Sequence, residues 1–422
     1  MPPSPSPFPS PVRLVALLLG AELLTMVGVF TFPALLPTFF EVWRLSNTEA
    51  GWISGIYFAG YTLSVPLLMR LTDRIDAKRV YMVGAAVTAL SALAFAVLAE
   101  GFWSAMIFRA LAGAGLAGTY MPGLRVLVDR YEGRRQARAV SFYTAGFSLG
   151  TALSFLFAGE LGAVIGWEWT FAVAGFAALG AAALMALAFR PITPQAEERE
   201  THFLDFRPVL RNRPALGFML AYGAHSWELF ALRSWLVAFL AFSVTLQPGA
   251  GAWPAPTTVA MLSALAAVAA SIGGQELSTR FGLRRVIPIV MLTSGAIAFV
   301  LGFLPGLPYL AVTVLVLVYS VAVQGDSAAL TIGTIQMARQ GQRGATLALH
   351  SLIGFGGAAL GPLVVGVVLD ASGGADRVSS WGLAFASVGL VAVAGPALLL
   401  ALTRSATAPR HGADTMTSPP DR

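Results

Sequence analysis

The sequence predicts an all-α integral membrane protein with twelve transmembrane helices in two pseudo-symmetric six-helix bundles. The 422-residue chain is 56% hydrophobic and only 11% charged, whereas ordinary soluble domains are roughly 25% charged. About twelve apolar segments follow one another along the chain, each near the ~20 residues that a helix needs to cross ~30 Å of hydrocarbon. Related features also recur in the two halves of the chain.

The apolar segments cover residues 13–38, 50–70, 80–99, 102–124, 139–162, 169–189, 214–242, 257–277, 286–304, 309–335, 344–369 and 381–403. The Pro- and Ser-rich segment before them is expected to be disordered, and the first apolar segment reads as a retained helix rather than a signal peptide. The expected organisation is a disordered tail over 1–11, an N-terminal bundle over 12–189, a cytoplasmic linker over 190–213, a C-terminal bundle over 214–403 and a C-terminal tail over 404–422.

The basic residues predict the orientation. Twenty-three of the 27 Lys and Arg residues lie in the tails or in loops that follow an even-numbered segment. Because basic residues stay on the cytoplasmic side, we expect both termini in the cytoplasm and the chain in the cytoplasmic (inner) membrane. The net charge of +6 therefore reports topology, and a nucleic-acid partner is not expected.

Two features indicate an internal duplication. The loop after the second segment, Asp73–Arg79, and the loop after the eighth, Thr279–Arg285, have equal length, with a basic residue second and two basic residues at the end. The fifth and eleventh segments share a Gly-x-x-x-Gly spacing at Gly146 and Gly357, which lets helix backbones approach closely. Six segments then fall in each half.

The loop residues resemble those of the major facilitator superfamily, and the resemblance extends over essentially the whole chain. Met69 and Asp76 replace the two glycines of the family's loop motif, and Thr279 replaces the acidic residue in the second copy. In the fourth segment Arg109 and Gly113 match a family pattern, with Ala112 in place of Gln. The loop positions that match are Asp73, Arg74, Lys78 and Arg79 in the first copy and Arg280, Gly282, Arg284 and Arg285 in the second.

This resemblance implies a rocker-switch secondary transporter, in which two six-helix bundles alternately expose a central site. It also implies that the acidic and basic loop residues form a cytoplasmic gate that latches one state shut. No cofactor is implied. Protons, a small solute or ion and the lipid bilayer are the expected partners, and the protein is expected to be a monomer.

Ionisable residues inside the apolar segments are the candidate site. A charge at bilayer depth costs several kcal/mol unless it is paired, hydrated or facing a cavity. They lie in the first, fourth, seventh and tenth segments, which a repeat of three-helix units would bring around one central space. These residues are Glu22, Arg109, His225, Glu228, Arg233 and Asp326.

Each has an alternative interpretation. Glu22 suits proton or substrate binding, because burial disfavours the charged form of a carboxyl group, but it could be paired structurally. Arg109 could bind an anion or tune a carboxylate. His225 and Glu228 share a helix face and could form a protonatable pair or a static one. Arg233 could snorkel outward, and Asp326 fits the central site and the gate equally.

The substrate stays open. Four aromatic side chains could form a substrate wall: Trp227, Trp235, Tyr57 and Tyr120. A secondary transporter, with proton coupling, is favoured. A uniporter or exchanger of small organic or inorganic anions is the alternative, and a transport-inactive receptor or scaffold is a third reading. An enzyme is not expected, and no metal site is expected, because the chain has no Cys and only four His.

The predicted topology can be tested in this cysteine-free chain. A single cysteine at position 195, in the predicted linker, should resist an impermeant thiol reagent in intact cells and react after the cells are opened. A cysteine between the first two segments, at Arg44, serves as the control and should react in intact cells. Labelling at position 195 in intact cells would contradict cytoplasmic termini.

Overall fold

A computed structural model describes residues 11–131, 136–192, 206–247 and 253–403, and every regular element in these ranges is a helix. Both predicted tails, apart from residue 11, and residues 193–205 of the predicted linker lie outside the described residues. The helices are α1 (Pro11–Met26), α2 (Thr31–Ala34), α3 (Leu36–Trp43), α4 (Asn47–Thr72), α5 (Ala77–Leu98), α6 (Phe102–Arg130), α7 (Gln136–Ala188), α8 (Arg207–Leu210), α9 (Arg213–Thr245), α10 (Pro256–Phe281), α11 (Leu283–Leu301), α12 (Tyr309–Gln324), α13 (Ser327–Met337), α14 (Arg343–Ala371) and α15 (Val378–Thr403).

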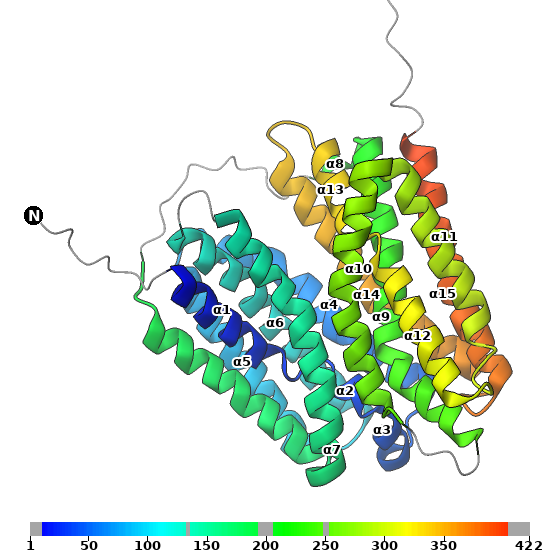
Figure 1. Cartoon of the computed structure of the whole chain (residues 1–422). Coiled ribbons are helices and arrows are strands. Elements are labelled where there is room, and N and C mark those ends of the chain that lie inside the picture. Colours follow the sequence, from blue (N-terminus) through cyan, green and yellow to red (C-terminus); the bar gives the residue numbers. More distant parts are fainter. Residues whose placement is uncertain (1–10, 132–135, 193–205, 248–252, 404–422) are drawn as a thin grey trace, which may run out of the picture.

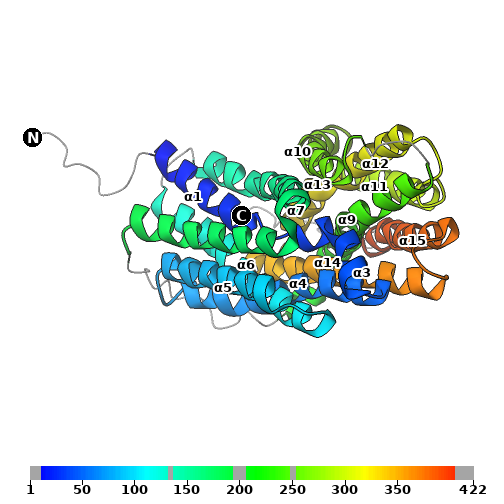
Figure 2. The same ribbon diagram turned by 90° about the horizontal axis from the view of Figure 1, so that it is seen from below.

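The helices form two groups, α1 to α7 and α9 to α15, with α4 and α14 at their junction (Figures 1 and 2). In the described ranges, nine helical stretches are long and apolar enough to cross a membrane. One of them, α7, is 53 residues long and holds the fifth and sixth predicted segments, which meet at a bend at Gly166 (φ 81°). The first predicted segment is not among the nine, because its break leaves α1 only 16 residues long. The fourth predicted segment corresponds to α6, which is also not among the nine.

The first predicted segment was expected to be one helix over 13–38, and this expectation is wrong. The chain leaves helical geometry after Met26 and forms the short helices α2 and α3. Proline has no backbone N–H to continue a helix, and α3 has a proline in its first turn. Ser154 of α7 supports the break, because its Oγ accepts from Phe30 N (2.9 Å) and donates to Val27 O (2.7 Å).

The tenth predicted segment, 309–335, is broken as well. It divides into α12 and α13 at Gly325 and Asp326. The carbonyl oxygen of Gly325 lies against Gly274 of α10, where any side chain would collide with it. The absence of a side chain at Gly274 therefore lets α10 approach the break directly.

The two duplicated loops differ in length, contrary to the expectation from the sequence. Four residues separate α4 from α5, and Asp76 caps α5 by accepting a hydrogen bond from Lys78 N (3.0 Å). A single residue, Gly282, separates α10 from α11. Its φ of 91° is readily adopted only by glycine, so the chain can turn there without a longer loop.

The repeated glycine spacing does produce equivalent contacts. Gly146 and Gly150 of α7 face Glu22 and Met26 of α1, while Gly357 of α14 faces Gly223 and Trp227 of α9. The first predicted segment thus packs on the fifth, and the seventh packs on the eleventh in the same way. This agreement supports the internal duplication.

Glycines also bring α6 against its neighbours. Gly113 faces the backbone of Tyr57 in α4, Gly115 faces Thr88 in α5, and Gly118 lies across from Gly84. A Cβ atom at Gly118 would be 2.7 Å from the Cα atom of Gly84. These glycines therefore serve helix packing.

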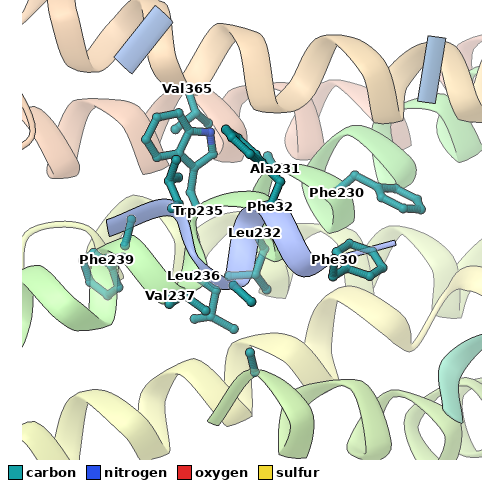
Figure 3. Packing of buried hydrophobic residues seen from close by; sticks show 14 of the residues in the cluster. Phe30, Phe32, Phe230, Ala231, Leu232, Trp235, Leu236, Val237, Phe239 and Val365 are labelled. Carbon is teal, nitrogen blue, oxygen red and sulfur yellow. The ribbon is translucent and has the colours of Figure 1, made fainter. Parts of the chain in front are cut away.

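The two groups of helices meet at the end of the molecule where α4 begins, hereafter the Asn47 end, as opposed to the Asp73 end where α4 stops. Gly51 and Gly55 of α4 lie against the backbone of α14, and Gly159 of α7 lies against Thr257 of α10. Figure 3 shows Phe30 and Phe32 beside the buried side chains of α9. Toward the end that holds α8, the two groups diverge in Figure 1.

Replacing Gly118 by Ala should lower the free energy of unfolding by about 1–3 kcal/mol, because the added methyl group overfills a helix contact. The matched control is Gly356→Ala in α14, where nothing lies within 4 Å of the added Cβ. That change should be neutral or slightly stabilising, since Ala favours helix interiors. Thermal unfolding of the detergent-solubilised protein measures both, and equal melting temperatures for the two variants would contradict the packing role.

Candidate functional site

Glu22 of α1 is buried, with 1% of its surface exposed. Among the described residues, neither of its carboxylate oxygens has a hydrogen-bond partner. One oxygen faces Gly146 of α7, where a side chain would displace it. The side chains of Tyr81, Tyr120 and Tyr143 are close enough to interact with it electrostatically. Glu22 therefore lies inside the first group of helices as an uncompensated carboxyl group.

Glu228 of α9 is equally buried but well partnered. Ser294 Oγ of α11 and Tyr319 Oη of α12 each donate a hydrogen bond to its carboxylate, both at 3.0 Å. Hydrogen bonds to a carboxylate favour its charged form. Glu22 and Glu228 thus lie in corresponding segments, but in the described part of the chain only Glu228 accepts hydrogen bonds.

His225 pairs with Asp326, and the expected pairing of His225 with Glu228 is not formed in the described part of the chain. His225 Nδ1 lies 2.7 Å from Asp326 Oδ1, which makes an ion pair when the ring is protonated. The atoms are close enough for a hydrogen bond, but their angles do not meet hydrogen-bond geometry. Asp326 is the N-cap residue of α13, so this pair connects α9 to the break in the tenth segment.

His350 of α14 extends this polar cluster, and the sequence reasoning missed it. Its ring nitrogens lie 3.3 Å from Thr331 Oγ1 and 3.2 Å from Thr334 Oγ1, both on α13. The ring stacks on Tyr222 at 3.9 Å, and Tyr222 in turn stacks on His225. His350 lies inside the predicted apolar segment 344–369, so it shows the same pattern in the sequence as the other ionisable candidates.

Arg109 of α6 holds the break in the first segment. Its guanidinium group donates to Val29 O (3.0 Å) and Gly28 O (3.4 Å) and lies 4.2 Å from the ring centre of Tyr57. A cavity of about 20 Å³ adjoins it, lined in part by Thr88 and Ser91. Arg109 therefore stabilises backbone carbonyl groups at the break, a role that differs from the anion binding or carboxylate tuning expected from the sequence.

Arg233 of α9 does not snorkel outward, because only 5% of its surface is exposed. Its guanidinium carbon lies 5.8 Å from the ring centre of Phe30 and 5.7 Å from that of Phe230. Phe230 also contacts Phe58 of α4 at 4.4 Å between ring centres. Arg233 thus belongs to an aromatic contact between the two groups of helices.

The four proposed wall residues separate into different environments. Trp235 is buried and donates from Nε1 to Pro362 O of α14 (2.9 Å). Tyr57 lies under Arg109, and Tyr120 stacks on Tyr143 near Glu22. Trp227 is partly exposed, and its indole nitrogen has no hydrogen-bond partner in the described ranges. The structure does not bring the four together as one wall.

At the Asp73 end, the predicted gate residues are mostly exposed. Asp73 pairs with Arg125 at 3.6 Å, and Arg280 pairs with Glu276 at 2.8 Å. Lys78 is buried and donates to the carbonyl groups of Ala186 and Phe189 at the end of α7. The exposed remainder are Arg74, Arg79, Arg284 and Arg285.

Asp76, which replaces a glycine of the family's loop motif, is buried at this end. Asp76 Oδ1 lies 3.3 Å from Arg130 Nη2, and Asp76 Oδ2 accepts from Ile192 N (2.8 Å). Arg130 also donates to Arg190 O (3.0 Å). This network joins the first loop to the ends of α6 and α7 within one group of helices.

A larger apolar hollow, about 630 Å³, lies along α11 and α12. Its lining includes Ile289, Leu292, Ile297 and Leu315, and no ionisable side chain contributes to it. The hollow is therefore separate from the polar clusters described above.

A model of the Major Facilitator Superfamily matches residues 18–325. The chain belongs to the Major Facilitator Superfamily. The resemblance read from the sequence is therefore confirmed, and the family is one of membrane transporters rather than enzymes.

Among curated proteins, this superfamily member is similar to protein spinster homolog 1 of Homo sapiens, with 24% identity over 238 residues, 54% of this chain and 45% of that protein. It is also similar to a putative metabolite transport protein of Haemophilus influenzae, with 28% identity over 213 residues, 46% of this chain and 52% of that protein. The chain spans about half the length of these relatives.

Solved structures show the same fold. One is the crystal structure of a bacterial homolog to the human lysosomal transporter Spinster in an inward-facing, unoccupied conformation, with a TM-score of 0.73, 18% identity and coverage of 95% of this chain and 96% of that one. Another is a variant of the nucleoside transporter NupG, with a TM-score of 0.74, 14% identity and coverage of 92% and 99%. At these identities the likeness shows the fold alone, and the predicted two-bundle membrane fold is confirmed.

Replacing Arg109 by Ala should lower both the melting temperature and the transport rate, because two buried carbonyl groups lose their donor, at about 1–3 kcal/mol for each unsatisfied group. Arg109→Lys should give an intermediate loss, since one ammonium group lacks the planar fork that reaches both carbonyls. The exposed Arg211→Ala is the control. Unchanged stability and transport in Arg109→Ala would overturn this role.

Proposed function

We propose that the protein is a proton-coupled secondary transporter that moves a small solute across the membrane by alternating access. Family membership supports transport, and the observation that carries proton coupling is the buried carboxyl group of Glu22. It accepts no hydrogen bond in the described part of the chain, and a charge at such a position is costly unless it is neutralised. A bound proton removes that cost.

Glu228 supports the same proposal from the other half of the chain. Ser294 and Tyr319 stabilise its charge by hydrogen bonding, so protonation there rearranges contacts between α9, α11 and α12. Glu22 then acts as the group that takes up a proton, and Glu228 as the group whose protonation is linked to helix movement. His225 lies one helical turn before Glu228 on α9 and pairs with Asp326, and these two residues complete the proposed site.

The solute is proposed to bind between bundles over 12–189 and 214–403, joined by a linker over 190–213. The aromatic side chains of Phe30, Phe58 and Phe230 meet there. With the predicted cytoplasmic termini, the Asn47 end faces away from the cytoplasm. Closure at that end supports an inward-facing state. In the opposite state, the gate residues close the Asp73 end. The protein acts as a monomer in the inner membrane.

Replacing either acid by Gln should abolish solute-driven proton movement while leaving solute binding within a few-fold of the parent protein, because the amide keeps the shape but cannot exchange a proton. Solutes that raise the melting temperature of the purified protein would be added to proteoliposomes that enclose a pH-sensitive dye. The variants are Glu22→Gln and Glu228→Gln.

The control for this experiment is Glu41→Gln in α3, whose carboxyl group is exposed and whose substitution should leave proton movement unchanged. If both Gln variants at the buried sites move protons together with solute at the rate of the parent protein, proton coupling through these residues is wrong.

A further inference from the structure

Asp370, near the end of α14, caps a helix that belongs to the other group. Its Oδ1 accepts hydrogen bonds from Asn47 N (3.1 Å) and Asn47 Nδ2 (2.7 Å), and its Oδ2 accepts from Thr48 N (2.7 Å). The three bonds span more than 320 positions of sequence and lie at the Asn47 end. A carboxylate is favoured at a helix N-terminus because the unpaired N–H groups and the helix dipole attract negative charge.

The first turn of α4 is satisfied from two sources. Ser46 forms a capping box with Glu49, in which Ser46 Oγ accepts from Glu49 N (3.2 Å) and Glu49 Oε2 accepts from Ser46 N (2.8 Å). Ala50 N donates to Ser46 O (3.1 Å). The first four N–H groups of a helix have no partner inside it, and the two that remain, those of Asn47 and Thr48, are the ones that Asp370 accepts.

Glycines allow the two helices to come close enough for this contact. A Cβ atom at Gly366, one turn before Asp370, would collide with the carbonyl group of Asn47. A Cβ atom at Gly51 would lie 2.7 Å from Pro362 O. The carboxylate is therefore held at the end of a tight backbone contact between α4 and α14.

We propose that Asp370 is the latch that keeps the Asn47 end of the transporter closed. Opening that end separates α14 from α4 and breaks all three hydrogen bonds at once. The capping box of Ser46 and Glu49 stays intact in that step because it lies wholly within one group of helices. The start of α4 is then preserved without Asp370, which makes the latch reversible.

The latch rests on alternating access, the transport mode proposed above, but not on proton coupling. It is tested on the full-length protein by distances between paired spin labels, in the absence of solute and of a proton gradient. Cysteines at the exposed positions Glu100 and Ser379 report on the Asn47 end. Cysteines at Arg70 and Thr279, also exposed, report on the Asp73 end.

Asp370→Asn should increase the population with a long distance at the Asn47 end by about tenfold, since it removes the charge and one acceptor of charge-assisted hydrogen bonds. The distance at the Asp73 end should shorten in the same population. Asn47→Ala removes only the side-chain donor and should give a smaller shift in the same direction, which keeps the test available if Asp370→Asn folds poorly.

The matched control is Asp376→Asn, an exposed carboxylate six positions further along the same end. It should leave both distance distributions unchanged. The latch is refuted if Asp370→Asn and Asn47→Ala give the distributions of the parent protein, or if Asp376→Asn produces the same shift. Loss of proton movement in the Glu22 variant has no bearing on this result, so the two proposals fail separately.

Discussion

The break in the first transmembrane segment imposes the constraint on which much of the structure depends. Backbone N–H and C=O groups at membrane depth must be satisfied by protein, because lipid offers no partners. Ser154 of α7 supplies one partner on each side of the break, and Arg109 of α6 supplies two donors. The first, fourth and fifth segments are thereby fixed relative to one another.

The second half of the chain also contains a broken segment, but there the contact that the structure shows is between two side chains. Its break lies in the tenth segment, where Asp326 is the N-cap residue of α13 and contacts His225 of the seventh segment. In the first half the cation Arg109 donates to backbone carbonyl groups, whereas in the second half the acid Asp326 pairs with His225. Segments one and four, and segments seven and ten, are thus linked through polar groups within each half, and the two hydrogen bonds to Glu228 also come from the second half.

The fold was predictable from the sequence because hydrophobic length and charge bias act on whole segments. Burial of Glu22, Arg109, His225, Glu228 and Asp326 was predictable for the same reason. Their partners were not, because each partner is chosen by the packing of distant helices. His225 and Glu228 share one helix face, but in the folded protein His225 pairs with Asp326 instead. Asp76 looked like a replaced glycine, and only its position beside Arg130 reveals it as a buried acid.

The separation in sequence between Glu228 and its hydrogen-bond donors has a consequence for biogenesis. Ser294 and Tyr319 follow it by 66 and 91 residues, so α9 is synthesised well before the groups that solvate its carboxylate. Arg109 is in the reverse position, because its carbonyl acceptors precede it by about 80 residues. The carbonyl groups that accept from Arg109 are thus synthesised before it, whereas the carboxylate of Glu228 lacks its two donors until α11 and α12 have been synthesised.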